Sequence, residues 1–336
     1  MLTQTETHRF CESSTYNYIY NKESGFFLRW GENFDDDPQW SPSGPEIMDL
    51  EISTVPCQHS KLCKHCYKDN TGSGENMSLE TFKVILSKMP SCMQIAFGLT
   101  DIDSNPDFIP IMEHCRLKGV VPNYTTSGYK VDENLAQKTA QICGAVAVST
   151  YPHNLVEAYE AIKLYLDAGM KQVNIHLLYH RDNMDFCRSV LDNGRNEEVN
   201  AIVLLAAKPV GRGSNLVPAT RDQFDSLVNH CMQEDIPLGF DSCSAPSFER
   251  WVKNSAMPPE QISRLIMCSD RCEAGCFSLY CNVRGEISPC SFTDRGDGIS
   301  LLDHTLEEIW NDGGMNAWRK NLWKNKRYCP AYNMGE

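Results

Sequence analysis

Several features that would point to a membrane, export or nucleic-acid function are missing from this sequence. No apolar run approaches the roughly 20 residues needed to span a bilayer, and the first residues, MLTQTETHRF, lack the apolar segment of a signal peptide. We therefore expect no membrane association and a cytoplasmic location. Lys and Arg number only 31 against 44 Asp and Glu, which leaves a net charge of −13. Because neutralised phosphates supply much of the affinity for nucleic acids, this balance argues against such a partner.

Cysteine, in contrast, is abundant, with 16 residues in a chain of 336. Without export features, this number does not suggest a disulfide framework, and metal binding is the better interpretation. Single cysteines inside apolar stretches behave as small hydrophobic residues. We assign that structural role to Cys92, Cys115, Cys143, Cys187 and Cys231, and we expect no ligand role for Cys11.

Short apolar runs alternate with helical patterns over residues 46–242, which predicts repeated βα units and a parallel sheet. The predicted strands are 47–55, 93–97, 120–125, 145–150, 172–178, 201–205 and 237–240. The predicted helices are 78–88, 106–118, 132–143, 155–168, 184–192 and 221–233. We expect an α/β fold, a partial (β/α)6 TIM-type barrel with its chemistry on the loops after the strands.

The barrel is expected between two smaller parts. Residues 1–45 form an N-terminal extension, in which two aromatic runs predict a β-hairpin. Residues 243–336 are expected to form a proline-containing connector, over 243–267, and then a small cysteine-rich domain.

Three cysteines cluster directly after the first predicted barrel strand. They are Cys57, Cys63 and Cys66. Three thiolates are one ligand short of a closed tetrahedral zinc site, although His59 or His65 would complete one. The other interpretation is that each thiolate binds one iron of a [4Fe–4S] cluster and that the fourth iron stays open.

A strand that leads into a three-cysteine loop ending Cys-x-x-Cys-Tyr resembles the radical S-adenosylmethionine (SAM) superfamily. The loop has five residues between its first two cysteines, where the common family pattern has three. The resemblance implies that SAM chelates the open iron through its amino and carboxylate groups. The reduced cluster then cleaves SAM to methionine and a 5′-deoxyadenosyl radical, which abstracts a substrate hydrogen. It also implies that Tyr67 packs near the adenine.

Other strand ends resemble SAM-binding segments of the same family. The Gly-Leu-Thr-Asp segment that ends at Asp101 implies an acceptor for the SAM ammonium group. Thr126 lies at the end of the third strand and Ser149 at the end of the fourth, where family members contact SAM. Asn174 and His176 lie two residues apart on the fifth strand, so both point to one face, which we expect to be the barrel interior. A core histidine is the alternative for His176.

A second group of cysteines lies in the C-terminal part and resembles the half-motif shared by SPASM and twitch domains. This resemblance implies one auxiliary [4Fe–4S] cluster with the ligands Cys272, Cys290 and Cys329. The fourth ligand is Cys243, at the end of the last barrel strand, or Cys276, and the resemblance favours Cys243. Four cysteines also suit a structural zinc ion, which is the alternative for this group. Cys268 and Cys281 are further cysteines of this part.

The resemblance implies an enzyme that abstracts hydrogen from a peptide or protein, at a side chain or an α-carbon, with an external electron donor such as flavodoxin or ferredoxin. Asp241, near the barrel mouth, is a candidate acid–base residue, with a helix or turn cap as the alternative. One rival function is radical SAM modification of a nucleotide or small metabolite. The other is a zinc-stabilised binding protein without enzymatic activity.

Overall fold

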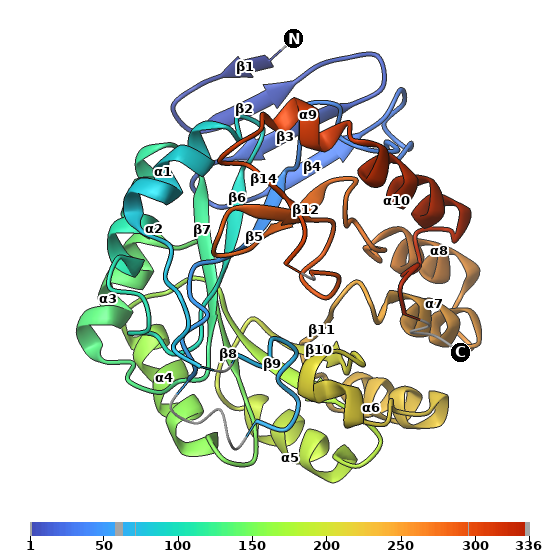
Figure 1. Cartoon of the computed structure of the whole chain (residues 1–336). Coiled ribbons are helices and arrows are strands. Elements are labelled where there is room, and N and C mark those ends of the chain that lie inside the picture. Colours follow the sequence, from blue (N-terminus) through green and yellow to red (C-terminus); the bar gives the residue numbers. More distant parts are fainter. Residues whose placement is uncertain (1, 58–62, 71, 295, 333–336) are drawn as a thin grey trace.

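The centre of the chain is a parallel sheet of seven strands that curves into a partial barrel (Figure 1). The computed structural model describes residues 2–57, 63–70, 72–294 and 296–332. Each barrel strand pairs with the next one along the chain, and within these residues no pairing joins the last strand back to the first. The strands are β5 (Ile47–Glu51), β6 (Gln94–Gly98), β7 (Val121–Thr126), β8 (Ala145–Ser149), β9 (Val173–Tyr179), β10 (Ala201–Ala206) and β11 (Leu238–Phe240).

Six helices alternate with these strands and cover the outer face of the sheet (Figure 1). They are α1 (Leu79–Ser87), α2 (Phe108–Leu117), α3 (Glu133–Ile142), α4 (Leu155–Asp167), α5 (Met184–Gly194) and α6 (Arg221–Glu234). Three begin at a side-chain N-cap, at Ser78, Asp132 and Thr220. The strands and helices follow the ranges predicted from periodicity, so the partial (β/α)6 barrel is confirmed.

The two faces of the barrel strands differ in character. In β9, Val173, Ile175 and Leu177 are fully buried in the hydrophobic core between sheet and helices. The intervening Asn174 and His176 are partly exposed and point to the opposite face, because side chains alternate along a strand. The interior of the barrel is therefore polar, as a chamber for a polar ligand requires.

The two N-terminal aromatic runs form an antiparallel pair, as the hairpin pattern predicts. Two further strands enlarge it to a sheet of four. The strands are β1 (Leu2–Gln4), β2 (His8–Cys11), β3 (Asn17–Asn21) and β4 (Phe27–Trp30). The buried Tyr20 hydroxyl donates to the carbonyl oxygen of Met93, just before β6, at 2.8 Å. The N-terminal sheet is thereby attached to the barrel strands.

A buried arginine links this N-terminal sheet to the C-terminal part. Arg29, on β4, forms ion pairs with Glu46 at 2.8 Å and Glu273 at 2.5 Å, and its guanidinium lies 3.6 Å from the ring centre of Phe277. Glu273 follows Cys272 directly. Buried carboxylates are costly without a partner, so this arginine fixes three segments that are distant in sequence.

The C-terminal part contains more helix than the sequence suggested. Helices replace most of the expected connector, because Pro246 and Pro259 stand in the first turn of α7 and α8, where proline is tolerated. Two more helices follow near the end of the chain. The bounds are α7 (Ala245–Lys253), α8 (Pro259–Met267), α9 (Leu306–Trp310) and α10 (Gly313–Lys324).

Three short strands of the C-terminal part extend the barrel sheet beyond β5. They are β12 (Ser278–Cys281), β13 (Glu286–Ser288) and β14 (Ile299–Ser300). β12 pairs with β5 in parallel, and the turn to β13 contains Gly285 at a φ of +81°. The result is a ten-stranded sheet, in which β12 with Cys281 lies next to the first barrel strand. Within the described part of the chain, no helix has the length and apolarity to cross a membrane.

Candidate active site

The first cysteine group lies after β5, at the carboxyl end of the barrel strands. Residues 58–62, which include the possible zinc ligand His59, lie outside the described residues. Burial raises the pKa of Cys57, and it raises that of Cys63 to about 11. The charges of neighbouring cysteines raise these pKa values further. The charge of Cys66 raises the pKa of Cys57, and the charges of Cys57 and Cys66 raise the pKa of Cys63. The three predicted ligands are thus within electrostatic reach of one another.

A short 3-10 helix after β10, η1 (Gly211–Asn215), holds the far end of this cysteine loop. The backbone N–H of Arg212 donates to the carbonyl oxygen of Cys66 at 3.0 Å, and its side chain also bonds Cys66, which raises the pKa of Arg212. Gly211 has a φ of +56°, and a Cβ atom there would lie 2.4 Å from the Tyr67 carbonyl oxygen. Only glycine allows this close approach of the two backbones.

Replacing Gly211 by alanine is expected to displace the loop that carries Cys66. The new methyl group would overlap the Tyr67 carbonyl in a left-handed backbone conformation. We expect iron bound by the reconstituted protein to fall by about half, since one of two four-iron clusters would be lost. Gly169→Ala is the matched control, because Gly169 has a φ of +80° but no atom within 4 Å of its Cβ position. Equal iron contents in the two variants would contradict the expectation.

Aromatic and histidine side chains from the β8–α4 loop surround the first cysteine group. His153 Nε2 lies 3.5 Å from Cys63 Sγ, and the rings of Tyr151 and His65 are 4.2 Å apart. Burial lowers the pKa of His65 to about 4, so its imidazole is neutral at pH 7. Sequence reasoning missed Tyr151 and His153, although their position directly after a barrel strand was a usable signal.

The second cysteine group joins residues from four segments of the chain. Burial raises the pKa of Cys272 to about 12 and that of Cys290 to about 11, and Cys329 adds to both shifts. Burial also raises the pKa of Cys243, with contributions from Cys272 and Cys290. Each of the four thiols is therefore in electrostatic contact with at least two others.

Cys276 packs in the same apolar cluster as Cys272, but the electrostatic contacts of its thiol differ. Burial raises its pKa, and the charged and polar groups that act on its thiol are Arg319, Arg327, Trp323 and Glu273. Of the two candidates that the sequence leaves open, the structure groups Cys243 with the other three. The remaining two cysteines of this part also stand elsewhere, Cys281 buried in β12 and Cys268 exposed after α8.

Two aromatic rings and an ion pair lie between the cysteine groups. The ring of Tyr67, next to Cys66, is 4.7 Å from that of Phe292, two residues after Cys290. Lys208 Nζ lies 4.9 Å from the centre of the Phe292 ring and pairs with Asp241. The two groups thus face one space rather than opposite sides of the molecule.

Asp241, the candidate acid–base residue, has two structural contacts. It pairs with the buried Lys208, and its carboxylate accepts hydrogen bonds from the Ser244 backbone at 3.0 Å and hydroxyl at 2.6 Å. The second contact caps the turn before α7. Burial alone would lower the pKa of Lys208, but the charge of Asp241 outweighs it and raises that pKa.

The other predicted contact residues lie at the ends of the barrel strands or inside. Asp101 is buried, and its charge raises the pKa values of Cys57 and Cys63, which places it beside the first cysteine group. The Thr126 hydroxyl accepts a hydrogen bond from the Gly128 N–H at 3.1 Å, so it is partly used in the turn after β7.

The interior contains further polar groups. Ser149 is buried and lies opposite His176 in the β8–β9 register. Burial lowers the pKa of His176 to about 4, so it is neutral there. Asn174 has a buried side-chain oxygen that receives no hydrogen bond. This buried oxygen can accept a hydrogen bond from an N–H or O–H group of a bound ligand.

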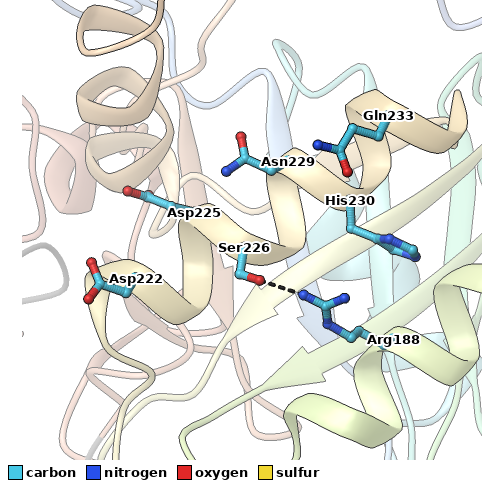
Figure 2. Close-up of a pocket in the computed structure, with 7 residues that line it drawn as sticks. All are labelled: Arg188, Asp222, Asp225, Ser226, Asn229, His230 and Gln233. Carbon is cyan, nitrogen blue, oxygen red and sulfur yellow. Dashed lines mark hydrogen bonds between the residues drawn. The ribbon is translucent and has the colours of Figure 1, made fainter.

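A polar pocket of about 360 Å³ lies elsewhere, between α5 and α6 on the outside of the barrel (Figure 2). Its side chains bond one another or their neighbours: Arg188 donates to Ser226, and Asp225 accepts two hydrogen bonds from Arg250. No cysteine lines it. We therefore place the candidate active site inside the barrel.

Comparison with solved structures decides the fold. Streptococcus suis SuiB bound to S-adenosylmethionine superposes with a TM-score of 0.72 over 95% of this chain and 90% of that chain, at 10% identity. The chain shares the fold of SuiB. SuiB bound to its precursor peptide SuiA gives a TM-score of 0.70 over 94% and 90% of the two chains, at 11% identity. The anSMEcpe structure with bound AdoMet and the Cp18Cys peptide gives 0.62 over 82% and 83%, at 13% identity.

This likeness concerns the fold. No protein-family model matches the sequence, and neither does any curated protein sequence. The fold that the radical SAM resemblance implied is the one that SuiB has, although only about one residue in ten is identical.

The donor atoms suit iron–sulfur clusters. Thiolates are the usual ligands of such clusters, and each group supplies sulfur from neighbouring side chains. Among the described residues, no three Cys, His, Asp or Glu side chains converge on a point where they would hold a single metal ion. A four-iron cluster takes each thiolate on a different iron, so its ligands are spread around it.

Proposed function

We propose that this chain is a radical SAM enzyme that abstracts hydrogen from a peptide or protein substrate. The observation that carries the proposal is the grouping of Cys57, Cys63 and Cys66 after β5, in a fold that SuiB shares. The SAM-bound structures of SuiB and anSMEcpe support the cofactor. The peptide complexes of these two proteins support the substrate class.

The chain's own residues have distinct tasks in this proposal. The three cysteines of the first group hold the cluster, whose chemistry when reduced is to cleave SAM and so generate the radical that abstracts hydrogen. Asp101 accepts the SAM ammonium group, since its carboxylate lies beside those cysteines. η1 holds the loop in position through Cys66. Cys243, Cys272, Cys290 and Cys329 hold an auxiliary four-iron cluster, and an external one-electron donor such as flavodoxin or ferredoxin supplies the electron.

Anaerobic reconstitution with iron and sulfide tests this function. We expect a brown protein with about eight irons per chain, from two four-iron clusters. With SAM and dithionite it should form 5′-deoxyadenosine, measured by liquid chromatography and mass spectrometry, and omission of dithionite should abolish the product. A colourless protein that binds zinc and does not cleave SAM would contradict the proposal. To test the substrate class, a short peptide encoded beside this gene is incubated with the enzyme and SAM, and an unchanged peptide mass would count against it.

A further inference from the structure

One carboxylate in the barrel interior has no partner. Asp49 lies on β5 between Met48 and Leu50, which are fully buried on the helix side, so its side chain points to the interior. No described residue forms an ion pair or a hydrogen bond with its carboxylate. The side chain is exposed although it points inward from the strand. It therefore borders an interior space.

The other charged groups on this side of the barrel are paired. Glu51, two residues along β5, forms an ion pair with Lys68 at 3.2 Å and accepts the Tyr280 hydroxyl at 2.9 Å. Lys68 also pairs with Asp294 at 3.4 Å. This cluster contains two carboxylates and one ammonium group, so it leaves no positive charge for Asp49.

The basic side chains near the second cysteine group do not neutralise the charge of Asp49 either. The charges of Asp49 and Lys208 both act on the Cys290 thiol, which places both near it. Lys208 is already paired with Asp241, and His176 is neutral. Of the acidic groups named here, Asp49 is the one without a counter-charge among the described residues.

We propose that Asp49 binds a cationic nitrogen of the substrate, an ammonium or guanidinium group such as that of a lysine or arginine side chain. An open carboxylate without a counter-charge from the described residues is complementary to a cationic ligand. The charge of Asp49 acts on the Tyr67 hydroxyl, so this carboxylate lies near the residue that follows Cys66. This assignment rests on the proposed function, because it places the substrate beside the Cys66 loop.

Two probe peptides that differ only in charge test the assignment. Acetyl-Gly-Lys-Gly-amide and its norleucine analogue are titrated calorimetrically into reconstituted, SAM-loaded protein. We expect the lysine peptide to bind at least about tenfold more tightly, a difference of about 1.4 kcal/mol. Asp49→Asn should remove this preference. Asp167→Asn, at the exposed end of α4, is the matched control and should retain it.

Three results would overturn the assignment: equal binding of the two peptides, no saturable binding of the lysine peptide, or a preference that persists in a folded Asp49→Asn variant. A variant that loses SAM affinity but keeps the peptide preference would place Asp49 in the SAM site, which also overturns it. Failure of the proposed function is recognised separately, as absence of 5′-deoxyadenosine from the parent protein without any peptide.

Discussion

Replacing Cys63 by alanine is expected to abolish 5′-deoxyadenosine formation from SAM. Cys63 is the central member of the first group, since both other thiols act on its pKa. In the proposed function, loss of one of the three thiolates removes one iron ligand of the cluster. Mutation of a residue that only contacts a metal ligand already lowers metal affinity or activity by roughly 10–100-fold. We therefore expect a loss of more than about 100-fold, measured as product per chain after anaerobic reconstitution.

Cys268→Ala is the control for this experiment. Cys268 is exposed after α8 and belongs to neither cysteine group, so its removal tests for a general effect of losing a thiol. It should cleave SAM at the parent rate. If the Cys63→Ala variant cleaved SAM as fast as this control, the three-cysteine site would be wrong.

The second large effect is expected from Cys243→Ala. The Cys243 thiol stands with Cys272 and Cys290, so its loss opens the auxiliary site. We expect iron to fall from about eight to about four per chain, because only the first cluster remains. Iron and sulfide analysis measures the fall, and electron paramagnetic resonance of the reduced protein shows which signal disappears.

Cys276→Ala separates the two candidates for the fourth ligand. Its thiol is fully buried beside Arg319 and Trp323. Truncation there should lower the free energy of unfolding by about 1 kcal/mol through lost packing and leave the iron content at about eight. Loss of iron in Cys276→Ala with full iron in Cys243→Ala would reverse the assignment.

The barrel was predictable because its signals are local. Each strand shows a short apolar run and each helix a 3.6-residue period, so neighbouring residues suffice to place β5–β11 and α1–α6. The first cysteine group was equally local, since its three members fall within ten residues of sequence. The spacing alone brings these thiols onto one loop.

The remaining features depend on contacts between distant segments. The sequence favours Cys243 over Cys276 only narrowly, because the electrostatic contact of Cys243 with Cys272 and Cys290 joins distant parts of the chain. The ion pair of Arg29 with Glu273 connects β4 with the C-terminal part, and hydrophobic periodicity does not predict contacts between such distant residues. Asp49 and Glu51 are two acidic residues of the same short strand, and only the structure shows that Glu51 is paired while Asp49 has no partner among the described residues. Prolines misled the prediction at α7 and α8, because a proline at a helix start and one in a connector look alike in sequence.

The parallel pairing of β12 with β5 has a consequence for the evolution and engineering of this protein. In the described structure, β5 would be a bare edge strand without β12, and bare edges invite intermolecular strand addition and aggregation. The cysteine-rich segment therefore shields the barrel as well as supplying thiols. Such a segment is not a detachable module: exchanging it between relatives requires a replacement strand that saturates the same backbone groups.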